Sequence, residues 1–366
     1  MKRPVFPGKR ILTLFAALSA IALVTAACEE KPGEDRPGIT ILNGVDGNVS
    51  VSAADPPPTP VPTQGPPPLF IPATDVQTQA NLGLDMRDIL ALMAPAAEGK
   101  AVDWTAVTAI YDNGRYSKTT TGGTRTFKSI ATSDPVLDAA VQAGLKGTER
   151  GTGLSDNARR QLVEKGILAI TRSQVLTELD TARTKLQQGQ AGEAGAAVDA
   201  AWGFYVGATD ETGARPFLLS SSARKRQANF TLEGVVDDTI QQAMTDMQAA
   251  VSKGEIATFD KARAEATGGL NAIFYLGVLR YAKVVYETSD TSARQVPQAE
   301  GWAFWQALRK TVESVDSAGA EKVEAIFTSK NTISASAVNE IYVVLNSRTV
   351  IAALGIPRDL SVSQPQ

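Results

Sequence analysis

The side chains of this chain that are suited to chemistry are tyrosines and carboxylates. The sequence has no histidine and one cysteine, which excludes Ser-His and Cys-His nucleophilic catalysis and the usual zinc sites. Phenolate and carboxylate oxygens are hard ligands, suited to Fe³⁺ or Ca²⁺. For any single tyrosine, the alternative is a core residue whose hydroxyl bonds a carbonyl. Tyrosines within apolar helical runs stand at positions 111, 205, 275, 281 and 286.

Two of these tyrosines have charged neighbours. Arg280 precedes Tyr281 in the middle of an apolar run, and a buried guanidinium there must find a carboxylate or a bound anion. Asp199 stands six residues before Tyr205, so on a helix the two side chains diverge by about 120°. They need not share a face.

An aromatic segment occurs twice, beginning at Trp202 and, one hundred positions later, at Trp302. Glu300 stands two residues before Trp302, where the first copy has Ala200. An acid in one copy alone indicates one asymmetric site. The alternative is that Glu300 is a first-turn acid after Pro297, favoured by the helix dipole.

Four short blocks around these residues resemble the recurring blocks of the algal iron-assimilation proteins. This is the low-iron-inducible periplasmic, or phytotransferrin-like, family, which has bacterial lipoprotein relatives. The resemblance covers roughly residues 100–330. The blocks are residues 199–207, 225–230, 277–282 and 300–304.

The resemblance implies capture of ferric iron outside the cell, with carbonate as a synergistic anion, for transfer to an uptake transporter. Family members often carry a second acid just before the first Trp, and Ala200 departs from that pattern. Carried over residue by residue, the resemblance implies a metal site of Asp199, Tyr205, Tyr281 and Glu300, with Arg280, Lys225 and Arg226 binding the anion.

Residues 1–28 have the pattern of an export signal, with basic residues before an apolar run and small residues before Cys28. A cysteine at this position predicts a lipid-anchored, extracytoplasmic protein. The alternative is an ordinary cleaved signal peptide and a chance cysteine. Residues 29–74 are rich in proline and predict a semi-rigid stalk.

Residues 75–356 are alanine-rich with helical apolar spacing, and residues 357–366 form a short tail. We expect an all-α helical bundle, built as an internal duplication of two antiparallel bundles around the two aromatic segments. The non-helical candidate is residues 119–126. Helix starts are predicted at Asp103, Asp134-Pro135, Ser155, Thr258, and Ser334 or Ser336, the last helix ending at Gly355.

Two functions remain open. The first is a lipid-anchored ferric-iron-binding protein, and the second is a tethered helical interaction module without metal. A relative of the imelysin-like proteins would share the helical build, but their Gly-x-His-x-x-Glu motif needs a histidine. Nothing marks out a catalytic pair of carboxylates, and the net charge of −3 gives no reason to expect nucleic acid. We therefore expect no enzyme.

Overall fold

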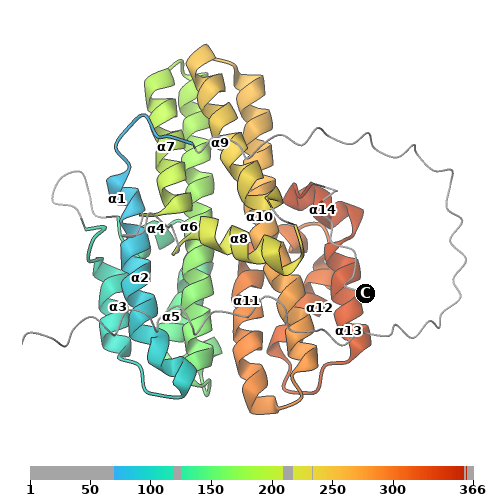
Figure 1. Ribbon diagram of the computed structural model, residues 1–366. Helices are drawn as coiled ribbons and strands as arrows, with labels where there is room; N and C mark the ends of the chain where they lie inside the picture. Colours follow the sequence, from blue (N-terminus) through green and yellow to red (C-terminus); the bar gives the residue numbers. More distant parts are fainter. Residues whose placement is uncertain (1–69, 119–124, 209–216, 233, 358–359, 361–366) are drawn as a thin grey trace, which may run out of the picture. The chain divides into compact units, whose positions relative to one another are not determined.

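The chain folds into α-helices joined by short connections (Figure 1). The computed structural model describes residues 70–118, 125–208, 217–232, 234–357 and 360, all within one unit, and these contain no strand. The expected all-α bundle is confirmed. The expected signal peptide, Cys28, most of the stalk and residues 119–124 lie outside the described residues. The helices are α1 (Gln77–Ala80), α2 (Leu82–Met93), α3 (Trp104–Asn113), α4 (Phe127–Ala131), α5 (Pro135–Lys146), α6 (Asp156–Gln187), α7 (Ala191–Val206), α8 (Leu219–Asn229), α9 (Val235–Lys253), α10 (Ile256–Glu287), α11 (Thr291–Glu313), α12 (Ser317–Thr328), α13 (Ala335–Leu345) and α14 (Arg348–Leu354), with 3-10 turns at Ala94–Glu98 and Glu149–Gly151.

Local capping fixes most helix starts. The side chains of Asp103, Asp134 and Ser155 each accept a hydrogen bond from a first-turn backbone N–H, as the sequence predicts. α10 begins at Ile256, two residues before the expected Thr258. The last predicted helix is in fact two, because Ser347 caps the start of α14.

A frame of three helices is repeated at a spacing of one hundred residues. α5, α6 and α7 begin at residues 135, 156 and 191, and α9, α10 and α11 begin at residues 235, 256 and 291. α6 and α10 both have 32 residues, so Trp202 and Trp302 fall at the same distance after them. The repeated frame agrees with an internal duplication.

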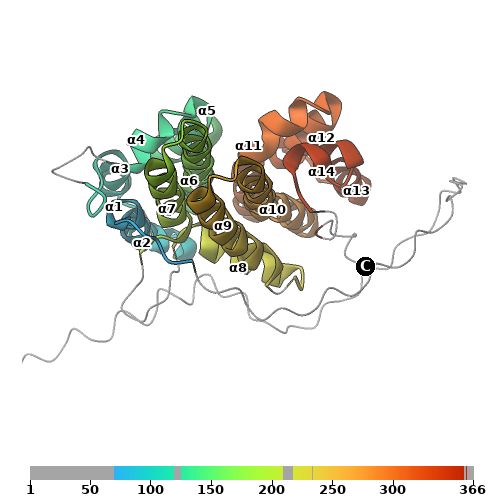
Figure 2. The same cartoon turned by 90° about the horizontal axis from the view of Figure 1, so that it is seen from above.

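The two long helices organise the packing. α6 contacts α5, α7 and α11, and α10 contacts α8, α9 and α11. Figures 1 and 2 show α8 crossing the direction of these helices, and it contacts both α6 and α10. α6, α8, α10 and α11 therefore meet in one region.

The packed domain extends beyond the expected limits of 75 and 356. Phe70 is buried, with its ring centroid 5.1 Å from that of Trp202. Asp199 on α7 accepts hydrogen bonds from the backbone N–H groups of Ala73 and Thr74. At the other end, Leu360 is buried.

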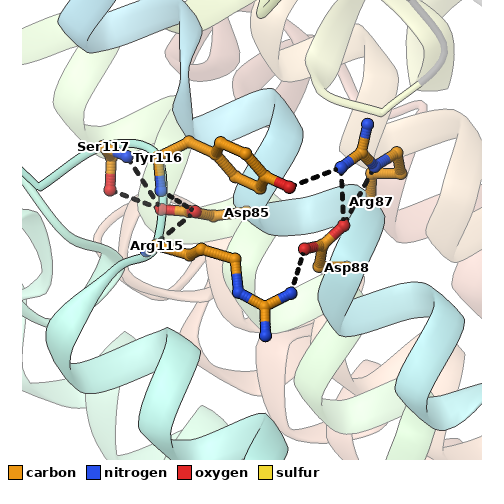
Figure 3. A network of polar contacts seen from close by, with 6 residues as sticks. All are labelled: Asp85, Arg87, Asp88, Arg115, Tyr116 and Ser117. Carbon is orange, nitrogen blue, oxygen red and sulfur yellow. Dashed lines mark hydrogen bonds and ion pairs between the residues drawn. The ribbon is translucent and has the colours of Figure 1, made fainter. Parts of the chain in front are cut away.

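A buried carboxylate on α2 fixes the turn that follows α3 (Figure 3). Asp85 accepts hydrogen bonds from the backbone N–H groups of Arg115 at 3.0 Å and Tyr116 at 2.8 Å, and from the hydroxyl of Ser117. Beside it, Asp88 pairs with Arg87 and with the Arg115 guanidinium. These polar groups are bonded to one another, so the network has a structural role and holds the turn after α3 against α2.

Within the described residues, no helix has the length and apolarity needed to cross a membrane.

Candidate functional site

Charged and polar side chains from four helices gather where α6, α8, α10 and α11 meet. We call this set the Lys165 cluster. Lys225 and Arg280 lie at its edge, the first exposed and the second partly buried. The cluster comprises Arg160, Gln161, Glu164 and Lys165 of α6, Arg226 of α8, Tyr281 of α10 and Glu300 of α11.

α6 supplies four members at helical spacing. Arg160 and Glu164, and likewise Gln161 and Lys165, are four residues apart and so lie one turn above each other. Arg160, Gln161 and Glu164 are buried, next to buried apolar residues of the same helix. Buried polar groups need partners, and here the partners come from other helices.

The ammonium of Lys165 joins two helices. It pairs with Glu164 beside it on α6 and with Glu300 of α11, where Nζ lies 3.2 Å from Oε1. Burial alone would lower the pKa of Lys165, but the charges of Glu164 and Glu300 outweigh burial and raise it. Burial favours the neutral acid for Glu164, yet the charges of Lys165 and Arg160 hold its pKa below the usual range. The pair is therefore ionised.

Glu300 lies in the middle of α11. The helix begins at Thr291 after the cap Asp290, and Pro297 is inside it. The alternative of a first-turn acid is therefore wrong, because Glu300 lies about two and a half turns after the start of the helix. Glu300 is buried and faces α6.

Tyr281 forms the α10 side of the cluster. Its ring stacks on Phe304 with centroids 6.0 Å apart, and Gly277 leaves room for the Phe304 ring, since a Cβ there would lie 2.7 Å from it. Burial, and next the charge of Glu300, raise the pKa of Tyr281 to about 12. The phenol therefore carries its proton at neutral pH.

Arg226 is the least satisfied member of the cluster. Its side chain is 7% exposed, and its guanidinium carbon lies 5.5 Å from the ring centroid of Tyr281 and 5.6 Å from that of Phe304. Among the residues that the structure describes, nothing accepts a hydrogen bond from its Nε or Nη1. Buried N–H groups of a guanidinium that have no acceptor are costly, so a site beside Nε and Nη1 favours an anion.

Gln161 links the two charged ends of the cluster. With its amide oriented so that both ends are satisfied, it donates to Glu300 Oε2 at 3.2 Å and accepts from Arg160 Nη2 at 3.0 Å. The cluster holds more basic than acidic side chains, with Glu164 and Glu300 as its carboxylates. Lys225 and Arg280 at the edge increase that positive excess.

The other two expected metal ligands are bound elsewhere. Asp199 is fully buried and accepts from Thr74 Oγ1 at 2.9 Å and Gln248 Nε2 at 2.6 Å, besides the backbone of Ala73 and Thr74. Both of its oxygens are occupied by protein donors. The expectation that it joins Tyr281 and Glu300 is not met.

Tyr205 is likewise satisfied locally. It is fully buried, and its hydroxyl donates to Asp237 of α9. Burial, then the charge of Asp237, raise the pKa of Tyr205, which keeps the phenol protonated. Asp237 also pairs with Arg224 at 3.2 Å. This arrangement is a structural contact between α7, α8 and α9.

The donor set of the Lys165 cluster is chemically suited to a hard cation. Tyr281, Glu164 and Glu300 supply one phenol and two carboxylates. Among the described residues, no three His, Cys, Asp or Glu side chains lie where they could hold one metal ion together, so a metal at this cluster needs the phenol of Tyr281 as a third ligand. With Lys165 in place, both carboxylates are already paired.

Glu164 and Lys165 are site residues that sequence reasoning missed. The sequence does contain a signal for them, because two adjacent charged residues interrupt an apolar stretch of α6, as Arg280 interrupts one of α10. A comparison with protein families, curated proteins and solved structures found no match.

Proposed function

We propose that this chain is a lipid-anchored extracytoplasmic protein that binds ferric iron at the Lys165 cluster. The proposal rests on the convergence of several predicted site residues in the fold. Tyr281, Glu300 and Arg226, singled out from the sequence, lie together with Glu164, and Lys225 lies at the edge. Transfer to an uptake transporter and anchoring through Cys28 belong to the same proposal.

The chemistry of the donors supports iron as cargo. Fe³⁺ favours anionic oxygen ligands, and it could draw one phenolate from Tyr281 and carboxylates from Glu164 and Glu300. The positive excess around them opposes a bare cation, so iron binds together with an oxyanion such as carbonate. Arg226 has N–H groups for that oxyanion, since a guanidinium fork suits a planar anion.

The first test is a titration of the purified full chain with a chelated ferric salt, with and without bicarbonate. We expect a saturable tyrosinate-to-iron charge-transfer band that Tyr281→Phe abolishes. Tyr205→Phe is the matched control, because that buried tyrosine is bound to Asp237 and should leave the band intact. A band that survives in Tyr281→Phe, or no band at all, contradicts the proposed ligand set.

The second candidate is a tethered interaction module without metal. It is favoured by the way Asp199 and Tyr205 are satisfied locally, since such a module requires no convergence of acids and tyrosines. Calorimetry separates the candidates. Absence of both the band and any heat of ferric binding would leave the module as the better description.

A further inference from the structure

The position of Lys165 within the site has a consequence for which ions can enter. Its ammonium stands between the carboxylates of Glu164 and Glu300, and its side chain is 11% exposed. Nζ also lies 5.9 Å from the ring centroid of Phe304. A metal ion bound by the same two carboxylates would have to replace this ammonium.

The two carboxylates cannot easily stand alone. Buried charges without partners are strongly destabilising, so the protein supplies its own cation. This cation is covalently tethered and therefore always present at high effective concentration. Any entering ion competes with it.

The competition is unequal for ions of different charge. Ca²⁺ and Mg²⁺ bind through several oxygens, and Mg²⁺ gives up its water reluctantly. With two carboxylates available they gain little by displacing an ammonium that already satisfies both. A trivalent ion gains more, because it also displaces the Tyr281 phenol proton, which is released to water, and so acquires a third anionic ligand.

We infer that Lys165 determines the specificity of the site by occupying the cation position, excluding divalent ions and yielding only to a trivalent ion that also binds Tyr281. The inference rests on the proposed function, since it assigns the selectivity of the same site.

The test replaces Lys165 by glutamine and measures Ca²⁺ binding to the full chain by calorimetry, after circular dichroism has verified the fold. The wild type should show no binding at about 1 mM Ca²⁺, a concentration at which weak extracellular sites fill. Lys165→Gln should bind Ca²⁺ about tenfold more tightly or better, because two carboxylates are released.

Three variants serve as controls. Lys165→Arg keeps the positive charge and should exclude Ca²⁺ as the wild type does. The exposed Lys253→Gln tests for a general charge effect and should change nothing. Adding Glu300→Gln to Lys165→Gln should remove the gained affinity. Equal Ca²⁺ affinity in Lys165→Gln and wild type overturns the inference.

A second measurement needs no variant. In the iron-free protein Lys165 should react slowly with an amine-acylating reagent, as read by mass spectrometry of its peptide, and ferric loading should accelerate the reaction. Unchanged protection in iron-loaded protein overturns the inference while leaving iron binding intact. Absence of ferric binding in the wild type instead contradicts the proposed function, whatever Lys165→Gln does with Ca²⁺.

Discussion

Replacing Asp199 by alanine should destabilise the domain and leave iron binding unchanged. The carboxylate accepts four hydrogen bonds, at 3.0 and 2.8 Å from backbone N–H groups, 2.9 Å from Thr74 Oγ1 and 2.6 Å from Gln248. Three of these bonds hold residues 73–74 against α7, next to the buried ring of Phe70, and the fourth joins α7 to Gln248 of α9. Asp199 therefore stabilises the fold, in contrast to the ligand role that the family resemblance implies.

The size of the effect follows from where the donors lie. A hydrogen bond to a charged group contributes about 1.5–3 kcal/mol, and a buried donor left without a partner costs a similar amount. Ala73 and Thr74 are exposed, so their donors can turn to water when the segment detaches. We therefore expect the free energy of unfolding to fall by about 2–4 kcal/mol, which is less than the loss of four independent hydrogen bonds to a carboxylate would give.

The assay is urea unfolding of Asp199→Ala and wild type, followed by circular dichroism, with limited proteolysis near residues 70–76. Glu193→Ala on the same helix is the control. Its carboxylate is 58% exposed and pairs with Lys185, so its loss should cost less than about 1 kcal/mol. A folded Asp199→Ala protein with unchanged stability refutes the reasoning, and so does one that loses the ferric band.

Two further predictions concern titration and packing. Because the pKa of Tyr281 is about 12 when folded and about 10 when unfolded, the folded state holds the extra proton between those values. Wild type should then lose stability relative to Tyr281→Phe as pH rises from about 10 to about 12, measured as urea midpoints at the two ends, and a constant difference would contradict this. Gly301→Ala places a Cβ 2.1 Å from Phe327 Cε1 and should cost about 1–3 kcal/mol in thermal unfolding. Gly192→Ala, a helical position with nothing within 4 Å, should instead stabilise by up to about 1 kcal/mol, and equal effects of the two would contradict the packing argument.

The local parts of the fold were predictable because their causes are local. Asp103, Asp134 and Ser155 start helices through their own side chains. The one-hundred-residue frame was visible in the two Trp segments and extends to the starts of six helices. The break between α13 and α14 was missed because the Ser347 cap follows an apolar run without proline or glycine.

The membership of the site was only partly predictable because convergence is a tertiary property. Glu300 and Tyr281 meet through the crossing of α10 and α11, which no spacing along one helix encodes. Asp199 and Tyr205 have the same residue types and similar surroundings in sequence, yet Gln248 and Asp237 satisfy them. Lys165 was not predicted as a site residue, because its partner Glu300 lies on another helix.

The contact between residues 73–74 and Asp199 also has a mechanical meaning. It is the first hydrogen-bonded contact with a helix that the described chain makes on entering the domain, and Phe70 packs against Trp202 just ahead of it. A pull on the chain from the N-terminal side would load these hydrogen bonds before it reached the long helices. Asp199 would then act as the anchorage at which tension on the leading segment is resisted, and the helices that carry the Lys165 cluster would be shielded from strain until it gave way.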